Sequence, residues 1–326
     1  MTGAASPASV TILVPGTLHD HAIGRIAGAF RLLEIETPDV SLVDPADVAA
    51  VRGIATFGEI DAAFIDAFPK LEIIAKIGVG YDSVDFGHAA KRGVMVTNTP
   101  DVLTEEVADS TVGILISVVR ELPKAEAWLR AGKWASQGPI PVSPLTLRQR
   151  SIGIFGMGRI GLAIAKRLEG FGLPIAYHNR RPVEGVAYAY HPSLKALAET
   201  VDTLICIAPG GPSTEKAVNA EILAALGPNG VFVNTGRGST VDEDALAKAL
   251  ADGTIAAAGI DVFANEPNVP QALLDAPNTM LLPHVASGSA HTRQAMADLC
   301  VDNLVAWFST GRPLTPVPET AGVKRR

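Results

Sequence analysis

The sequence predicts an α/β protein with two doubly wound lobes, each a parallel β-sheet covered by helices. Short apolar runs alternate with helical patterns along almost all of the 326 residues. Every strand-like run is followed by a long crossover segment rather than a two-residue hairpin turn, which is the pattern of parallel sheets. A glycine-rich turn at residues 156–161 connects a strand-like run to a helical pattern and marks the second lobe.

Runs of apolar and β-branched residues predict the strands. In the first lobe they occupy residues 10–14, 54–57, 71–77 and 94–96. In the second lobe they occupy residues 152–155, 175–177, 203–207, 231–234, 256–260 and 280–282. Because a short apolar run between turn residues is typical of a strand buried on both faces, each set predicts one complete sheet.

The turn Gly156-Met157-Gly158-Arg159-Ile160-Gly161 predicts a dinucleotide-binding site. Gly156 allows the tight turn, Gly158 allows the backbone to approach a pyrophosphate, and Gly161 allows close packing of helix on strand. The phosphates would lie at the helix N-terminus, where the helix dipole favours negative charge. The helix that follows has one apolar face, predicted by the spacing of Ile160, Ile164, Leu168 and Phe171.

The end of the next strand indicates which dinucleotide is bound. In such β-α-β units an acidic residue at this position usually accepts the ribose hydroxyls of NAD(H). This sequence instead has His178-Asn179-Arg180-Arg181. Two guanidinium groups can hold a 2′-phosphate through charge-assisted hydrogen bonds, so the pattern favours NADP(H), with NAD(H) as the weaker alternative. The other interpretation is that Arg180 and Arg181 are solvated loop charges.

Two helical patterns predict where the lobes join. Residues 104–120 are apolar with little polar face, which predicts a helix buried between the lobes or in a subunit interface. A last pattern at 292–308 can return the chain to the first lobe. We therefore predict a Rossmann cofactor domain at 101–290, inserted in a flavodoxin-like domain made of residues 1–100 and 291–326.

Composition excludes several classes of protein. The formal net charge is -7 and there is no basic stripe, so nucleic acid is not an expected partner. The apolar runs are too short to cross a bilayer, and residues 1–9 show no export signal. The two cysteines, Cys206 and Cys300, lie in apolar patterns typical of buried reduced thiols, which favours a cytoplasmic protein.

Three polar residues follow strand-like runs of the second lobe, namely Arg237, Glu266 and His284. The carboxyl ends of parallel strands meet at one edge of a sheet, so these side chains can meet despite their separation in sequence. A guanidinium can bind a carboxylate and polarise an adjacent carbonyl, and an imidazole can supply a proton. A carboxylate beside the imidazole orients it and favours its charged form. The three groups together suit the reduction of a 2-oxo acid by hydride.

Each of these residues also has a structural interpretation. His284 could be a hydrogen-bonded structural histidine, Glu266 could belong to a simple turn, and Arg237 could be a loop charge between two glycines. His291 is the rival acid, although no carboxylate lies near it in the sequence. We expect no metal centre.

Motifs in a defined order give the chain a specific resemblance. They are the glycine-rich turn at 156–161, Asn234-Thr235-Gly236-Arg237-Gly238, Asp261-Val262-Phe263 with Glu266-Pro267, Pro283-His284, Gly78-Val79-Gly80-Tyr81-Asp82, Thr97-Asn98-Thr99-Pro100, the stretch 104–109 and the loop 209–214. Over nearly its whole length the chain thereby resembles the D-isomer-specific 2-hydroxyacid dehydrogenase family.

The resemblance implies roles for individual residues. Arg237 would bind the 2-oxo acid, His284 would be the acid/base, and Glu266 would pair with His284. The amides of Val79 and Gly80 would hold the substrate carboxylate. The residues implied for cofactor binding are Thr104, Gly156, Met157, Gly158, Arg159, Ile160, Asn179, Arg180, Arg181, Pro209, Thr214, Thr235, Gly236 and Asp261, the last of these at the nicotinamide carboxamide.

The ending Asn179-Arg180-Arg181 resembles the NADP-type glyoxylate/hydroxypyruvate reductase branch of that family. This branch implies a homodimer that reduces glyoxylate and hydroxypyruvate to glycolate and D-glycerate. Two alternatives stay open. The same chemistry could act on 2-ketogluconate or an aryl pyruvate, or the chain could be a dehydrogenase-like corepressor or scaffold that acts by binding partners.

Overall fold

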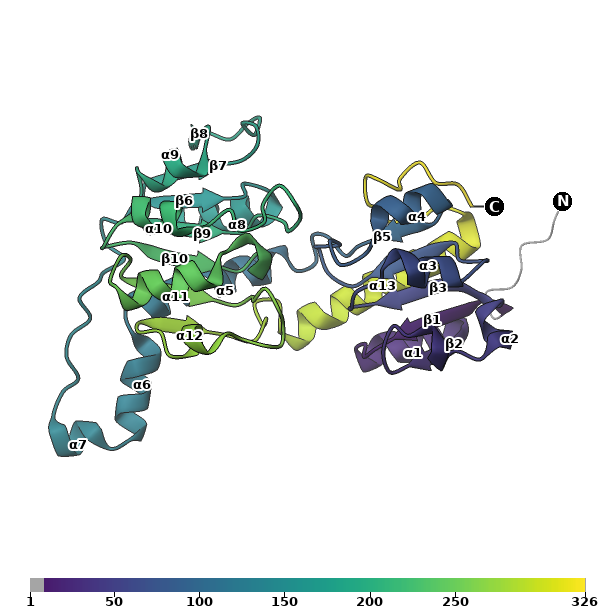
Figure 1. Ribbon diagram of the computed structural model, residues 1–326, viewed down its shortest axis with the longest axis horizontal. Coiled ribbons are helices and arrows are strands. Elements are labelled where there is room, and N and C mark those ends of the chain that lie inside the picture. Colours follow the sequence, from purple (N-terminus) through teal and green to yellow (C-terminus); the bar gives the residue numbers. More distant parts are fainter. Residues whose placement is uncertain (1–8, 326) are drawn as a thin grey trace. The chain divides into compact units, whose positions relative to one another are not determined.

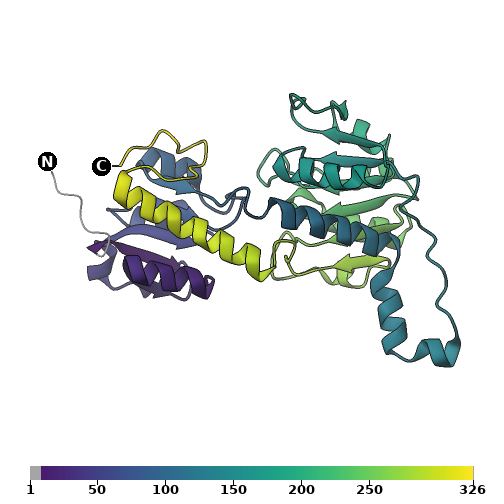
Figure 2. The ribbon, with the colours of Figure 1, turned by 180° about the vertical axis from the view of Figure 1, so that it is seen from behind.

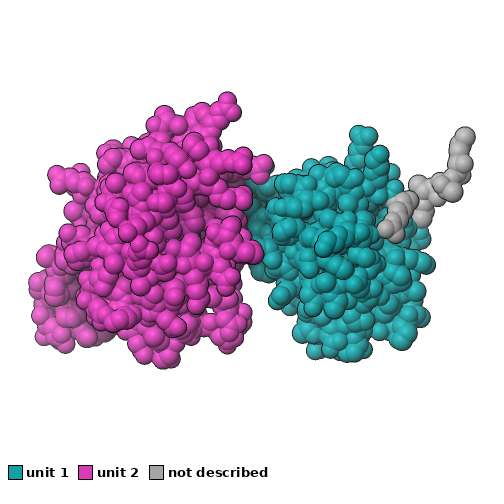
Figure 3. Space-filling view, turned by 45° about the horizontal axis from the view of Figure 1, so that its top comes forward, with its two compact units in different colours: residues 1–103, 289–326 teal, residues 104–288 magenta. Residues whose placement is uncertain are grey.

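The computed structural model describes residues 9–325 (Figure 1). They form two compact units, shown in separate colours in Figure 3. Unit 1 comprises the chain up to Leu103 together with the segment from Ser289 onward, and unit 2 is Thr104–Gly288. Each unit has its own sheet and its own apolar core.

Unit 1 contains a five-stranded sheet in the order β2-β1-β3-β4-β5, and all its strand pairs are parallel. The strands are β1 (Thr11–Pro15), β2 (Arg31–Ile35), β3 (Val51–Thr56), β4 (Ile73–Lys76) and β5 (Met95–Thr97). The helices are α1 (Asp20–Ala29), α2 (Pro45–Val48), α3 (Ala62–Ala67), α4 (Phe86–Arg92) and α13 (Ala290–Thr310). Helix α13 packs on α1 and on strands β3 and β4, and Figure 2 shows α1 and α13 on one face.

Unit 2 contains a seven-stranded parallel sheet in the order β12-β11-β10-β9-β6-β7-β8. Its strands are β6 (Ile152–Phe155), β7 (Ile175–His178), β8 (Ala189–His191), β9 (Thr203–Cys206), β10 (Val231–Asn234), β11 (Ala257–Ile260) and β12 (Thr279–Leu281). The strand order reverses between β6 and β9, which is the arrangement of a dinucleotide-binding Rossmann sheet. The fold class predicted from the sequence is confirmed.

The helices of unit 2 follow the strands in the usual alternation. They are α5 (Thr104–Val119), α6 (Leu122–Arg130), α7 (Lys133–Gln137), α8 (Arg159–Glu169), α9 (Leu194–Ala198), α10 (Ala220–Leu226), α11 (Glu243–Ala251) and α12 (Gln271–Leu274). Phe171, expected on the buried face after the glycine-rich turn, is instead exposed. Helix α8 ends at Glu169, and Gly172 adopts a positive φ of 69°, so the chain has left the helix before that side chain.

The apolar runs in the sequence did not predict β2 and β8, each of which lies at an edge of its sheet. In β2 only Ile35 is buried, two residues are half-buried, and Arg31 and Glu34 are exposed. Strand β8 has three residues, one exposed and two half-buried. An edge strand does not need the continuous apolar run that marks a strand buried on both faces.

Helix α5 is buried within unit 2, so the expected role between lobes or subunits is not needed to explain its apolar surface. It packs on α8 and on strands β10, β11 and β12. Nine of its sixteen residues are buried. Gly259 of β11 permits this packing, because a Cβ at that position would lie 2.3 Å from the Ile114 side chain.

Residues 121–146, which we call the arm, extend from unit 2 and contain α6 and α7 (Figure 1). Four large apolar side chains of the arm are exposed, Leu122, Leu129, Trp134 and Val142, the last of these to 91 %. Several exposed large apolar side chains on one projecting segment are typical of a surface that binds another protein.

Both cysteines are free and buried, as the sequence predicted. Burial raises the pKa of the Cys300 thiol to about 12 and also raises the pKa of Cys206. Because the thiolate is the reactive form, we expect neither thiol to react with a water-soluble disulfide reagent in the native protein at mildly alkaline pH. Both should react after denaturation. Rapid titration of either thiol in the native protein would contradict this expectation.

Candidate active site

The three polar residues singled out in the sequence follow three adjacent strands of unit 2. Arg237 follows β10, Glu266 lies in the loop after β11, and His284 follows β12. These strands are neighbours and parallel, so their carboxyl ends lie at the same edge of the sheet. The fold therefore brings the three loops together.

His284 and Glu266 form a direct pair. The imidazole Nδ1–H donates to the Glu266 carboxylate at 2.8 Å, and both side chains are 37 % exposed. The other carboxylate oxygen of Glu266 accepts the amide of Phe263 at 2.9 Å. Because the Glu266 carboxylate accepts from Nδ1, it fixes the orientation of the imidazole ring and assigns proton exchange with a substrate to the other ring nitrogen, Nε2.

The charge of Glu266 is stabilised by its neighbours. Burial alone would raise the pKa of this carboxyl group, but the hydrogen bonds from His284 and Phe263 and the positive charges of His284 and Arg237 outweigh it. The pKa of Glu266 therefore lies below its ordinary value, and the side chain stays ionised at neutral pH.

Asp261 fixes the loop that carries His284. It is fully buried, and its two carboxylate oxygens accept the amides of Val285 and Ala286 at 2.8 and 2.9 Å. Its backbone carbonyl accepts the amide of His284 at 2.8 Å. His284 has a φ of +53°, a conformation unusual for a non-glycine residue, and these three bonds hold it there. Burial raises the pKa of the Asp261 carboxyl, while the two amides oppose that effect.

The Arg237 loop is fixed from two sides. The buried Asn234 side chain donates to the Arg237 carbonyl at 3.0 Å and accepts the Gly236 amide at 3.0 Å. Thr235 shares a hydrogen bond of 2.8 Å with Thr111 of α5. The sequence did not single out Thr111, since a polar residue in an apolar helix gives no sign of its partner.

Gly238 lets the Arg237 loop pack against the loop that carries Glu266. A Cβ at this position would lie 1.9 Å from the Phe263 carbonyl carbon and 2.2 Å from the Ala264 nitrogen. We expect Gly238→Ala to lower the free energy of unfolding by about 3 kcal/mol, because backbone on both sides must shift. Thermal melting checks this. Gly158→Ala is the matched control, because a Cβ there meets nothing within 4 Å. Equal melting temperatures for Gly238→Ala and Gly158→Ala would contradict the packing role of Gly238.

The glycine-rich turn has the geometry of a phosphate cradle. Gly156 has a φ of +109°, and a Cβ there would lie 2.7 Å from the Ala208 nitrogen of the neighbouring strand's loop. A Cβ on Gly161 would lie 2.3 Å from the Gly156 carbonyl oxygen. Gly158 faces open space, directly before the first turn of α8. The backbone is therefore open where a pyrophosphate would approach the helix N-terminus.

The other residues expected at the cofactor lie on several elements of unit 2. The Asn179 side-chain oxygen accepts the Met157 amide at 2.6 Å, so this residue fixes the turn itself. Arg180 and Arg181 are exposed just beyond β7. Thr214 donates to the Pro209 carbonyl at 2.7 Å and closes that loop. Thr104 is buried, and its hydroxyl has no hydrogen-bond partner among residues 9–325.

In unit 1, the loop that contains Val79 and Gly80 follows β4. The Asn98 amide donates to the Val79 carbonyl at 2.7 Å. Gly78, with a φ of +124°, exchanges two hydrogen bonds of 2.8 Å with Thr99, one through the threonine hydroxyl and one through its amide. Within the described chain no group accepts from the amides of Val79 and Gly80, which suits them to an anionic ligand.

Comparison with known proteins identifies the family. The model of the D-isomer specific 2-hydroxyacid dehydrogenase NAD binding domain matches residues 112–286. The chain belongs to the D-isomer specific 2-hydroxyacid dehydrogenase family. The resemblance seen in the sequence motifs is thereby confirmed.

Individual relatives of this dehydrogenase cover nearly the whole chain. The NADPH-dependent glyoxylate/hydroxypyruvate reductase of Sinorhizobium meliloti, solved in complex with NADP and malonate, is 59% identical, with a TM-score of 0.95 over 98% of this chain and 99% of that one. The glyoxylate/hydroxypyruvate reductase A HPR2 of Arabidopsis thaliana is 42% identical over 95% of this chain and 99% of its own. The hydroxyphenylpyruvate reductase of Plectranthus scutellarioides is 44% identical over 86% and 88%.

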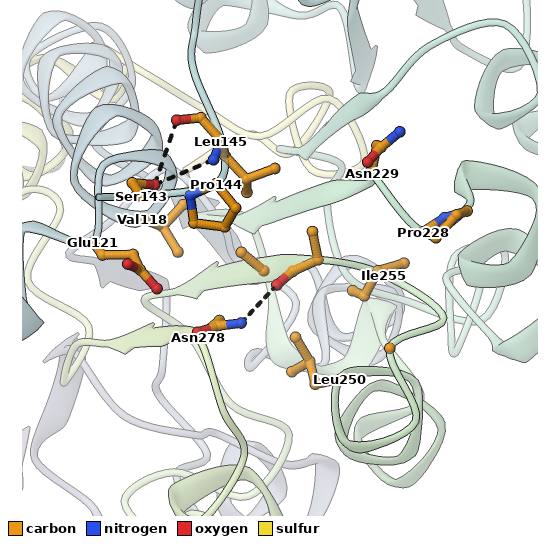
Figure 4. Close-up of a pocket in the computed structure, with 13 residues that line it drawn as sticks. Val118, Glu121, Ser143, Pro144, Leu145, Pro228, Asn229, Leu250, Ile255 and Asn278 are labelled. Atoms are coloured by element: carbon orange, nitrogen blue, oxygen red, sulfur yellow. Dashed lines mark hydrogen bonds between the residues drawn. The ribbon is translucent and has the colours of Figure 1, made fainter. Parts of the chain in front are cut away.

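A cavity of about 260 Å³ lies at the opposite edge of the dehydrogenase sheet in unit 2 (Figure 4). Its lining includes Val118 of α5, Ser143 and Leu145 of the arm, and Asn278, which donates to the Ala256 carbonyl at 3.3 Å. Asn278 and Ala256 precede β12 and β11, so this cavity lies at the amino ends of the strands. Residues 237, 266 and 284 do not line it.

Within the described residues, no helix is both long and apolar enough to span a membrane. The same residues contain no group of three or more His, Cys, Asp or Glu side chains placed to hold a metal ion.

Proposed function

We propose that this dehydrogenase uses NADPH to reduce small 2-oxo acids, glyoxylate and hydroxypyruvate first, to glycolate and D-glycerate. The observation that carries the proposal is the His284–Glu266 pair beside Arg237 at the carboxyl edge of the Rossmann sheet. The similarity to two glyoxylate/hydroxypyruvate reductases supports the choice of substrate.

Each residue has a defined task in the reaction. Arg237 binds the 2-oxo acid and polarises its carbonyl, and the amides of Val79 and Gly80 bind the substrate carboxylate. His284, charged and held at Nδ1 by Glu266, gives the proton on Nε2 to the carbonyl oxygen as it becomes a hydroxyl. Asp261 keeps the His284 loop in place through the amides of Val285 and Ala286.

When bound, NADPH supplies the hydride. The glycine-rich turn at 156–161 would receive its pyrophosphate, with Thr235, Gly236, Pro209 and Thr214 on neighbouring loops. Arg180 and Arg181 would bind the 2′-phosphate. The buried Thr104 hydroxyl, which has no partner within the described chain, would donate or accept at the cofactor.

The pH dependence follows from the Glu266 carboxylate. With its pKa below the ordinary value of 4.5, its stabilising effect is fully present above pH 4.5 and is lost as the pH falls through the lowered pKa. Because Glu266 must be ionised to hold Nδ1 of His284, wild-type kcat/KM should fall as the pH drops through this lowered pKa, whereas Glu266→Gln, which has no carboxyl group to titrate, should be slower and lack that acid-side fall. Profiles of kcat/KM against pH check this. A variant profile that overlays the wild type would remove Glu266 from this role.

The deciding experiment is an initial-rate panel with NADPH and NADH as cofactors. The substrates are glyoxylate, hydroxypyruvate, 2-ketogluconate and 4-hydroxyphenylpyruvate. We expect the highest kcat/KM for the first two with NADPH. A higher kcat/KM for either larger acid would instead support one of the alternative substrates. For 4-hydroxyphenylpyruvate, that alternative is supported by the similarity to the hydroxyphenylpyruvate reductase of Plectranthus. NADPH binding without turnover of any acid would indicate a corepressor or scaffold.

The protein is further proposed to form a homodimer through the arm, which supplies four exposed apolar side chains. Leu129→Glu with Trp134→Glu should yield monomers in sedimentation equilibrium, whereas Leu314→Glu, also at an exposed leucine but in unit 1, should not. A monomeric wild type would refute the dimer.

The two buried free thiols support a reducing compartment such as the cytoplasm.

A further inference from the structure

Unit 1 contains two cations on one aromatic ring. Lys76, the last residue of β4, is only 5 % exposed, and its ammonium donates to the Phe57 carbonyl. The same ammonium lies 4.8 Å from the centre of the Phe57 ring. The Arg293 guanidinium, from the first turn of α13, lies 5.5 Å from that centre. Phe57 itself is 43 % exposed.

This group lies at the carboxyl edge of its sheet. Strands β3 and β4 are parallel neighbours with Thr56 opposite Lys76, so Phe57 and Lys76 both stand where the strands end. Lys76 precedes Val79 by three residues, which an extended chain spans in at most about 11 Å. The two cations are therefore in the same part of unit 1 as the amides proposed to bind the substrate carboxylate.

The buried ammonium of Lys76 is stabilised by its neighbours. A lysine ammonium is rarely buried, because it loses its hydration, and the loss must be offset by nearby acceptors or aromatic faces. The Phe57 ring that both cations contact is itself 43 % exposed, so the group reaches solvent at this edge through the ring. Ammonium and guanidinium groups placed together favour a negatively polarised oxygen, and three N–H donors let an ammonium hold more than one acceptor.

We propose that Lys76 and Arg293 form a subsite for the oxygen on the third carbon of the substrate, with Phe57 holding the two cations in place. The inference rests on the proposed function, in which the amides of Val79 and Gly80 bind the carboxylate at the first carbon. The subsite selects 2-oxo acids that carry a hydroxyl or carboxylate on the third carbon over those whose third carbon is an unsubstituted methyl group.

Hydroxypyruvate and pyruvate test the subsite, because they differ only in that hydroxyl group. The measured quantity is the ratio of their kcat/KM values with NADPH. Wild type should favour hydroxypyruvate, and Lys76→Met should lower the ratio about tenfold, as expected for loss of a hydrogen bond to a charged group. Lys91→Met is the matched control, an exposed lysine on α4 of the same unit, and should leave the ratio unchanged.

Arg293→Met is the second variant, and should also lower the ratio, so the proposal does not depend on the folding of Lys76→Met. Oxaloacetate has a carboxylate on the third carbon, so in both variants kcat/KM for oxaloacetate should fall at least as much as kcat/KM for hydroxypyruvate. The subsite is refuted, while the reductase activity stands, if the wild type has equal kcat/KM for hydroxypyruvate and pyruvate. It is also refuted if the variants lower kcat/KM for all three acids equally. If the wild type reduces none of the acids, the proposed function itself fails and the subsite fails with it.

Discussion

Replacement of His284 by alanine is expected to lower kcat for glyoxylate and hydroxypyruvate about a thousandfold. Nδ1 of the imidazole donates to Glu266 at 2.8 Å, so Nε2 is the nitrogen proposed to transfer the proton. Proton transfer of this kind contributes a factor of about 10² to 10⁴. The NADPH dissociation constant should change little, because His284 is proposed to act on the carbonyl oxygen. Steady-state rates and cofactor titration by fluorescence measure the two effects separately.

His291→Ala is the control for this experiment. His291 was the rival acid in the sequence, and it is an exposed residue in the first turn of α13. We expect its removal to change kcat by less than about twofold, as for a surface substitution. Near wild-type turnover by His284→Ala, or collapse in His291→Ala instead, would exclude the assignment of His284 as the acid.

The sequence predicted the sheets and the meeting of Glu266 with His284 for the same reason. Apolar runs define parallel strands, and polar residues just after such strands share one edge. The prediction required no knowledge of the residues between them. This explains why a separation of 18 positions in the sequence did not hide a hydrogen bond of 2.8 Å.

The supports of the site could not be predicted in this way. Ser110 of α5 donates to the Ala286 carbonyl at 2.9 Å, and Thr111 of the same helix bonds Thr235. Their partners lie more than 120 residues away, and a helical pattern indicates which face is buried but not what it touches. The two hydrogen bonds by which Asp261 holds the His284 loop could not be predicted either, because every non-proline residue has a backbone amide and the sequence does not show which amide a side chain binds.

Replacement of Arg180 and Arg181 together by alanine should lower the preference for NADPH over NADH about a hundredfold. Both side chains are exposed just beyond β7, where the adjacent Asn179 is already used to hold the Met157 amide. No carboxylate stands at this strand end to bind ribose hydroxyls, so discrimination depends on the two guanidinium groups. Loss of two charge-assisted hydrogen bonds to a phosphate, weakened by solvent screening, amounts to about 2.7 kcal/mol or a factor of a hundred.

The measurement is the ratio of kcat/KM for the two cofactors at saturating hydroxypyruvate. A double variant of Arg148 and Lys248, two exposed cations elsewhere on unit 2, removes the same charge and should leave the ratio unchanged. Added salt should reduce the wild-type preference, because screening weakens a surface phosphate contact, and should affect the Arg180 and Arg181 variant less. Equal losses with NADPH and NADH would show that these arginines support the fold or the pyrophosphate rather than the 2′-phosphate, since only the latter distinguishes the two cofactors.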